Sequence, residues 1–182
     1  EAEAYSVYVS GTDVYASGYE SNGTNYIAKV WKNGVATNLT DGTADAQAYS
    51  VFVSGSDVYV AGYEFNGTNL VAKVWKNGVA VTLGSGATYS EAYSVVVSGT
   101  DVYITGYENN GTNDVAKLWK NGIATSLTDG TVAASALAVY VHNNDVYVAG
   151  NEGNFAKFWK NGVATSLTNG VNSSTARAIF VR

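Results

Sequence analysis

The sequence predicts an all-β fold made of repeated four-stranded antiparallel units, and three observations lead to this prediction. The first is internal repetition: residues 48–91 match residues 4–47 at 28 of 44 positions, and residues 92–135 follow at the same period. The second is the recurrence of tight-turn signals between short apolar runs, which leaves no window of helical length. The third is composition, because 46% hydrophobic residues, fourteen tyrosines and no proline suit a β-rich core.

Each copy of the repeat carries four strand signals in order. The runs are short, rich in valine and tyrosine, and bounded by turn residues. Ser10–Asp13 closes the first hairpin, Asn22-Gly23 the second and Asn33-Gly34 the third. Both residues of an Asn-Gly pair tolerate the positive φ of a type I′ hairpin turn. The predicted strands of the first copy are Tyr5–Val9, Val14–Tyr19, Tyr26–Lys32 and Val35–Leu39.

The size and connections of the unit predict a β-propeller of four-stranded antiparallel blades. The longest connection, Thr40–Gln47, joins the last strand of one unit to the first strand of the next. Three tight hairpins and one longer link are typical of a propeller blade, and 44 residues is a usual blade length. A β-solenoid is the main alternative, but its coils are shorter and lack tight antiparallel hairpins. The expected blades are 4–47, 48–91, 92–135 and 136–175.

The repeat pattern also resembles known propeller blades. The run AYSVFVSGSDVYVAGYE, followed by AKVWKNG and a Leu-Thr-Asp-Gly ending, resembles blades of the NHL and YVTN type. It is similar to an uncharacterised bacterial branch that carries this AKxWKNG signature. The resemblance covers nearly the whole chain and implies a propeller, but it implies no particular activity. The start, Glu1-Ala2-Glu3-Ala4, resembles the spacer left by a yeast secretion leader, so we expect residues 1–3 to be an expression scar before a single domain, 4–182.

The strand count leaves ring closure open. Four units of four strands and the beginning of a fifth unit, residues 176–182, make seventeen predicted strands, whereas a four-bladed ring needs sixteen. An unpaired apolar strand invites association. The chain is therefore a fragment of a longer propeller, a homo-oligomer joined through this terminal strand, or a four-bladed ring with one covered edge.

Charge and composition exclude several classes of function. Ten basic and fifteen acidic side chains give a net charge of -5 without a basic patch, which argues against nucleic acid and anionic membranes as partners. No apolar run approaches the roughly 20 residues of a membrane-spanning helix, so we expect no membrane insertion. The absence of cysteine and the single His142 exclude disulfides, thiolate metal sites and paired-imidazole sites. We expect no metal and no cofactor.

Two sets of residues recur once in each unit. The tryptophans lie in the middle of the third strand, where an aromatic ring in a doubly covered sheet belongs to the core between blades. They are Trp31, Trp75, Trp119 and Trp159. A glutamate ends the second strand and a lysine lies on the third, as Glu20 and Lys29 do in the first copy. Their interpretation as an ion pair competes with one in which the carboxylate binds a ligand hydroxyl.

A tyrosine precedes the glutamate in the first three copies, beside the loop between the second and third strands. A tyrosine ring stacks on the C–H face of a sugar while carboxylates and amides bind its hydroxyls, although core packing explains the tyrosine equally well. The fourth copy has Asn151 in this place, so the site is altered there. The candidate ligand-binding residues are Tyr19, Glu20, Tyr63, Glu64, Tyr107 and Glu108.

Other motifs have simpler interpretations. The hairpin aspartates, such as Asp13, are expected to cap turns through nearby backbone amides. His142 lies in a turn without a partner for nucleophilic catalysis. The inner strands AYSVYV, AYSVFV, AYSVVV and ALAVYV carry no acid, which argues against a glycoside hydrolase and leaves only loop carboxylates such as Glu91 and Asp114. Glycosylation sequons occur at Asn22, Asn38, Asn66, Asn110 and Asn172.

These observations together predict a non-catalytic, lectin-like protein that binds carbohydrate through repeated shallow sites. Repeated weak sites would give avidity rather than one tight pocket. The expected location is secreted or at the cell surface, with a glycan or a protein as partner. The alternatives are a protein–protein interaction scaffold, a module of a larger surface protein and, less favoured, a glycoside hydrolase.

Overall fold

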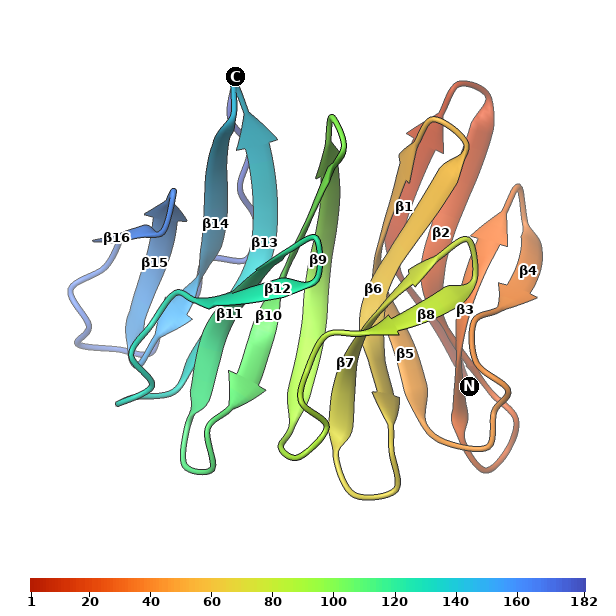
Figure 1. The fold of residues 1–182 in the computed structure, drawn as a ribbon, viewed down its shortest axis with the longest axis horizontal. Helices are drawn as coiled ribbons and strands as arrows, with labels where there is room; N and C mark the ends of the chain where they lie inside the picture. Colours follow the sequence, from red (N-terminus) through yellow and green to blue (C-terminus); the bar gives the residue numbers. More distant parts are fainter. The chain divides into compact units, whose positions relative to one another are not determined.

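The computed structural model describes all 182 residues, and its only regular elements are β-strands. Sixteen strands form four antiparallel sheets of four strands each (Figure 1). Within every sheet the strands follow each other in chain order, as consecutive hairpins require. The predicted all-β fold of four-stranded antiparallel units is therefore confirmed. The chain contains no helix with the length and apolarity needed to cross a bilayer.

Each sheet corresponds to one copy of the sequence repeat. Repeat 1 contains β1 (Ala2–Ser10), β2 (Asp13–Ser21), β3 (Tyr26–Lys32) and β4 (Val35–Asn38). Repeat 2 contains β5 (Ala46–Ser54), β6 (Asp57–Phe65), β7 (Leu70–Lys76) and β8 (Val79–Thr82). Repeat 3 contains β9 (Ser90–Ser98), β10 (Asp101–Asn109), β11 (Asp114–Lys120) and β12 (Ile123–Ser126). Repeat 4 contains β13 (Ala134–His142), β14 (Asp145–Glu152), β15 (Phe155–Lys160) and β16 (Val163–Ser166).

The third hairpin of each repeat has the predicted turn, whereas the second does not. Asn33 and Gly34 have φ angles of 51° and 81°, the left-handed values that a type I′ turn requires at both positions. In repeats 1–3 the second connection is instead a four-residue loop, and in repeat 1 the Asn22 N–H donates to the Asn25 carbonyl over 3.0 Å. Asn22 serves there as a side-chain acceptor for the Thr24 and Asn25 N–H groups, at 3.0 and 2.9 Å. Its place in the loop follows from this Asx geometry rather than from a positive φ.

A β-bulge recurs in the first strand of the repeats, next to a glycine that the backbone crowds. In repeat 2 the pairing between β5 and β6 shifts between Ala48 and Ser50. Opposite this shift, a Cβ atom placed on Gly62 would lie only 1.9 Å from the Gln47 carbonyl oxygen. The same close approach occurs at Gly18 in repeat 1 and at Gly150 in repeat 4. Glycine is needed here because neighbouring backbone fills the space of a side chain.

The core lies between neighbouring sheets. The chain forms two compact units, 1–95 and 96–182. We call the face of a sheet that carries its tryptophan the tryptophan face, and the opposite face, which carries Tyr15 in repeat 1, the tyrosine face. In residues 1–95, Tyr15 and Ala28 on the tyrosine face of repeat 1 pack against Val51, Val60 and Trp75 on the tryptophan face of repeat 2.

Residues 96–182 contain the same arrangement. Tyr103 and Ala116 on the tyrosine face of repeat 3 pack against Val139, Val148 and Trp159 on the tryptophan face of repeat 4. Trp75, Trp119 and Trp159 have no exposed surface, so the prediction that they are structural is confirmed for these three. Trp31 differs, because its indole is only half-buried.

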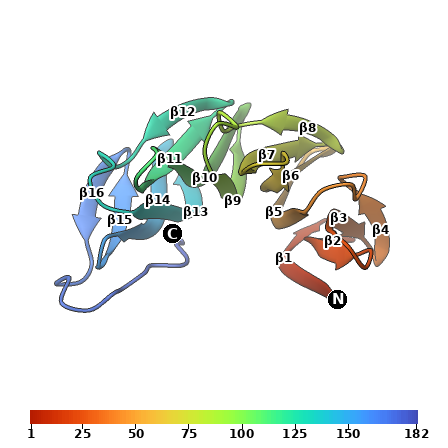
Figure 2. The same ribbon diagram turned by 90° about the horizontal axis from the view of Figure 1, so that it is seen from below.

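The two ends of the chain differ from the predicted boundaries. Ala2 and Glu3 belong to β1, where they pair with Glu20 and Tyr19. The expected seventeenth strand, residues 176–182, is not a strand in the structure. In repeats 1–4 the first strand pairs with the second strand of its own repeat. The segment instead returns to lie beside β13 (Figure 2), as its ring contact with that strand confirms.

Candidate functional site

The three candidate tyrosines lie in the core. Tyr19, Tyr63 and Tyr107 are 4%, 7% and 8% exposed. Adjacent residues of a strand point to opposite faces of the sheet, so a tyrosine and the glutamate that follows it cannot share one site. The Tyr63 ring packs 5.8 Å from that of Tyr49, a partly buried tyrosine of the first strand. Rings buried this deeply have no free face for a sugar, and they therefore carry no part of the proposal below.

The glutamates face the other side of each sheet, where every one of them pairs with a lysine. In repeat 1, Lys29 on β3 pairs with Gly18 on β2, and Glu20 lies two residues further along β2. The side chains of Glu20 and Lys29 are therefore diagonal neighbours on the tryptophan face. The shorter loop of repeat 4 keeps this relation, with Lys157 opposite Gly150. The predicted ion pairing is confirmed in all four repeats. The pairs are Glu20–Lys29, Glu64–Lys73, Glu108–Lys117 and Glu152–Lys157.

The pairs of repeats 2 and 3 are loose and include a hydroxyl group. The Glu64 Oε2–Lys73 Nζ distance is 3.5 Å, while the Lys73 ammonium donates a hydrogen bond of 2.9 Å to the Thr82 hydroxyl. The corresponding ammonium of Lys117 lies 3.8 Å from Glu108 and donates to the Ser126 hydroxyl over 2.9 Å. The lysine side chains are 13–17% exposed, and the glutamate side chains 20–42%. The carboxylate is thus the more accessible partner.

The structure places two of these pairs in the walls of shallow hollows. The hollow of repeat 2 has a volume of about 210 Å³ and is lined by Glu64 and Lys73, with Phe65, Val71 and Thr82 beside them. The hollow of repeat 4 measures about 380 Å³. It is lined by the corresponding Glu152 and Lys157 together with Val132, Gly153, Asn154, Phe155 and Gly170. We call each glutamate–lysine pair, together with the surface around it, a Glu–Lys site.

An asparagine fixes the loop beside the site in the first three repeats. In repeat 2 the Asn66 side-chain oxygen accepts the N–H groups of Thr68 and Asn69, at 3.0 and 2.8 Å. Its amide nitrogen donates to the carbonyl of Gly86, in the link to the next repeat, over 2.9 Å. Asn22 and Asn110 bind their loops and links in the same way. The turn therefore explains these asparagines without a glycan.

Sequence reasoning missed an aromatic side chain that lines the site of repeat 4. Phe155, which is 38% exposed, begins β15 and pairs with Glu152, so both side chains lie on the tryptophan face. The ammonium of Lys157 lies 5.9 Å from the centre of the Phe155 ring. The other three repeats have Ile27, Val71 and Val115 at this position, so the repeat alignment does not reveal an aromatic residue there. In repeat 3, the Asn109 amide donates to Asp114 over 2.8 Å.

A second charged cluster lies at the opposite end of each sheet. The Asp57 carboxylate lies 2.7 Å from the Lys76 ammonium and accepts a bond of 2.8 Å from the Asn77 amide. These two partners hold the pKa of Asp57 below its ordinary value of 3.8. The backbone-capping prediction for these aspartates is corrected, since the partners recorded are side chains of the third strand and third turn. Asp13, Asp101 and Asp145 have the same partners and the same direction of shift.

Two of the four first strands contain an acidic residue, so the prediction that these strands carry no acidic residue is wrong for them. β1 includes Glu3 and β9 includes Glu91, which was expected in a loop, and Asp114 likewise begins a strand. The Tyr49 hydroxyl donates a 2.8 Å hydrogen bond to Glu91. Burial, together with this carboxylate, raises the pKa of Tyr49 well above its ordinary value of 10. Glu91 is thus a hydrogen-bond partner of the partly buried Tyr49.

Comparison with known proteins adds no relative to this picture. No protein-family model matches the chain, and no curated protein matches it significantly. The resemblance to NHL and YVTN blades therefore stays a prediction.

Proposed function

We propose that the chain is a non-catalytic carbohydrate-binding protein of β-propeller architecture, acting at the cell surface or outside the cell. Its binding elements are the Glu–Lys sites of the four repeats. The propeller proposal is supported by four-stranded antiparallel sheets whose tyrosine and tryptophan faces pack together within each unit. The observation that carries the function is the recurrence of one partly exposed acceptor beside one donor, at the same place in every repeat.

The chemistry of the pair suits neighbouring hydroxyl groups of a neutral sugar. The glutamate carboxylate accepts a hydrogen bond from one hydroxyl, and the lysine ammonium donates to the oxygen of the next. The charges of the pair balance, so the site does not select for a charged ligand. In repeat 4, Phe155 supplies apolar surface for the C–H face of a sugar ring.

The shallow form of the sites predicts weak individual binding and strong binding to repeated ligands. A few hydrogen bonds at an open surface give modest affinity, because water competes for the same groups. Four sites on one chain convert this into avidity for a polysaccharide or a dense glycan surface. The expected ligand is therefore a repeating neutral glycan rather than a free monosaccharide.

Two matched fourfold variants test the proposal on a glycan and polysaccharide array. The first changes Glu20, Glu64, Glu108 and Glu152 to Gln, and the second changes Asp13, Asp57, Asp101 and Asp145 to Asn. Both remove four carboxylates from ion pairs. In repeat 2, Asp57 and Glu64 are seven residues apart on β6, about 23 Å at strand rise, so the control leaves the Glu–Lys site untouched.

We expect the wild-type chain and the aspartate variant to bind the same neutral glycans, and the glutamate variant to lose at least tenfold in apparent affinity. Circular dichroism establishes that both variants are folded. Absence of any glycan signal for the wild-type chain would contradict the proposal, as would equal binding by a folded glutamate variant.

A further inference from the structure

The tryptophan face of repeat 1 is uncovered. In repeat 2, where repeat 1 covers this face, Val51 and Val53 are 4% and 5% exposed. The corresponding valines of repeat 1, Val7 and Val9, are 66% and 61% exposed. Trp31, which corresponds to the fully buried Trp75, is only half-buried. The surface that forms a core in repeat 2 thus faces solvent in repeat 1.

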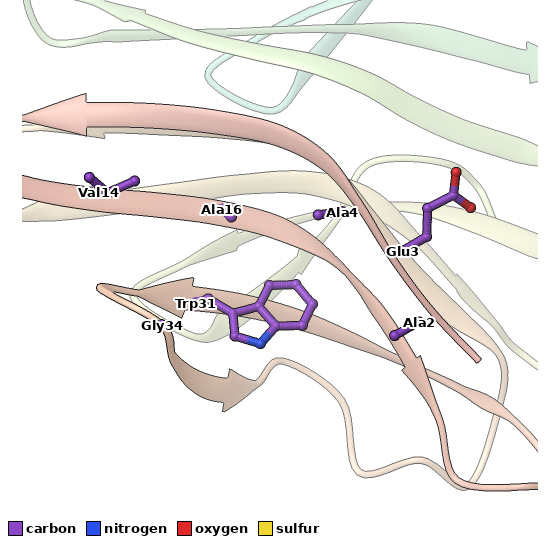
Figure 3. A pocket seen from close by; sticks show the side chains of 7 residues that line it. All are labelled: Ala2, Glu3, Ala4, Val14, Ala16, Trp31 and Gly34. Carbon is purple, nitrogen blue, oxygen red and sulfur yellow. The ribbon is translucent and has the colours of Figure 1, made fainter.

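This face is hollowed around the tryptophan. A cavity of about 390 Å³ is lined by Ala4, Val14, Ala16 and the Trp31 indole, with Glu3 at its edge (Figure 3). The carboxylate of Glu3 points away from the indole (Figure 3). The lining is therefore almost wholly apolar, which suits packing against another apolar surface.

The tyrosine face of repeat 4 is the complementary half of this interface. Leu39, on the corresponding face of repeat 1, packs against repeat 2, whereas Leu167 of repeat 4 is 56% exposed. Tyr147 remains partly exposed, while its equivalents in the other three repeats are 8% exposed. The first and last repeats therefore each expose one half of a contact that the chain forms internally.

The segment after repeat 4 partly covers that half. Phe180 contacts the Tyr140 ring edge-on at 5.2 Å, as Phe52 of repeat 2 contacts Tyr8 of repeat 1 at 4.7 Å. The segment thus occupies the place of the first strand of a following repeat. The Ala176 N–H donates to the Gly150 carbonyl over 3.1 Å, but the segment has no strand ladder, and Phe180 remains 68% exposed.

We propose that the tryptophan face of repeat 1 binds the tyrosine face of repeat 4 of a second copy, head to tail, and displaces residues 176–182 from it. A second copy is the occupant because the tyrosine face of its repeat 4 carries residues of the types by which repeat 1 covers the tryptophan face of repeat 2. Tyr140, Tyr147, Phe158 and Leu167 correspond to Tyr8, Tyr15, Val30 and Leu39. A complete four-stranded sheet with Trp31 offers more apolar contact than the terminal segment does.

Two single variants and their mixture test the proposal, because a head-to-tail contact uses two different surfaces. Val7→Lys blocks the first surface and Leu167→Lys the second. Both residues are exposed, so both variants are expected to fold. By light scattering after size exclusion, we expect the full chain to form multiples of 19.0 kDa and each variant to remain monomeric. An equimolar mixture forms a dimer, since each variant retains one intact surface.

A monomeric full chain at all concentrations would overturn the proposal, as would association that both variants leave unchanged. Phe180→Ser tests the displacement, because it removes the ring contact of the terminal segment with Tyr140. We expect the concentration for half-association to fall about two- to tenfold. A rise would show that the segment belongs to the interface and would overturn its displacement. Trp31 fluorescence gives an independent signal, since its emission shifts to shorter wavelength when association buries the indole.

Discussion

At the scale of the residue, equal positions in the repeat do not have equal environments. Trp31 and Trp75 lie in nearly identical sequence, yet Trp75 has no exposed surface and Trp31 is half-buried. The difference arises because repeat 1 covers the tryptophan face of repeat 2. The core role of the tryptophans was predictable from their place on a doubly apolar strand. The exposure of Trp31 depends on neighbours outside its own repeat.

Alanine substitutions at these two tryptophans are expected to differ in cost. Trp75→Ala removes a fully buried ring and lowers the free energy of unfolding by about 3–5 kcal/mol. Trp31→Ala removes a partly exposed ring and costs less than half as much. Urea unfolding at a protein concentration where the chain is monomeric measures both. Equal losses would contradict the packing described for repeats 1 and 2.

The hairpin aspartates predict a specific pH dependence of stability. Lys76 and Asn77 hold the pKa of Asp57 below 3.8 in the folded chain, and the other three aspartates follow. When the pKa of a carboxyl group is lower in the folded chain than in the unfolded chain, the group stabilises the fold at any pH above its unfolded pKa. This stabilisation is lost as the pH falls through the folded pKa. The fourfold Asp→Asn variant should melt below wild type at pH 7, with the difference shrinking toward zero near pH 2. A difference independent of pH would contradict the assignment.

At the scale of the element, turn chemistry was predictable and local crowding was not. The Asn33-Gly34 turn was predicted from its dipeptide and has the required positive φ at both residues. The Asn22-Gly23 dipeptide gave the wrong turn, because the Asn22 side chain organises a longer loop. The bulge opposite Gly62 has no signal in one copy alone, since its cause is the approach of another strand.

Gly62→Ala is expected to destabilise repeat 2 even though the residue lies on a strand. The new methyl group would meet the Gln47 carbonyl oxygen at 1.9 Å, so backbone must move, at a cost of about 1–3 kcal/mol. Gly55→Asn is the control, because Gly55 lies in open space and Asn143 takes its place in repeat 4 with a φ of 49°. Chemical unfolding of both variants tests the bulge. A stable Gly62→Ala chain would show that the close approach does not exist.

The alternation of side chains along a strand separates the tyrosine and the glutamate that the sequence placed in one site. Tyr63 and Glu64 are neighbours in sequence, and this proximity predicted one site. A strand sends them to opposite faces, with Tyr63 in the core and Glu64 beside Lys73. The glutamate–lysine relation was predictable, because the even shortening of the repeat 4 loop preserves it. Phe155 was not predictable, since no other repeat has an aromatic residue at this position.

At the scale of the whole molecule, the proposed binding depends on the repetition of one weak site. Each Glu–Lys site offers one acceptor and one donor, so binding strength comes from the number of sites. The repeat count and the four-stranded units were predictable from the 44-residue period. The exposure of the tryptophan face of repeat 1 and of the tyrosine face of repeat 4 was not predictable, because the sequence of a repeat does not specify what covers its faces.

Isothermal titration calorimetry with a soluble oligosaccharide selected from the array counts the sugar-binding sites on each chain. Four Glu–Lys sites predict four equivalents of ligand for each chain, and three for the Glu64→Gln variant, with the remaining sites unchanged. Asp57→Asn, which alters the other ion pair of the same sheet, should retain four. A single equivalent for the wild-type chain, or an unchanged number in Glu64→Gln, would contradict the claim that each Glu–Lys site binds one sugar unit.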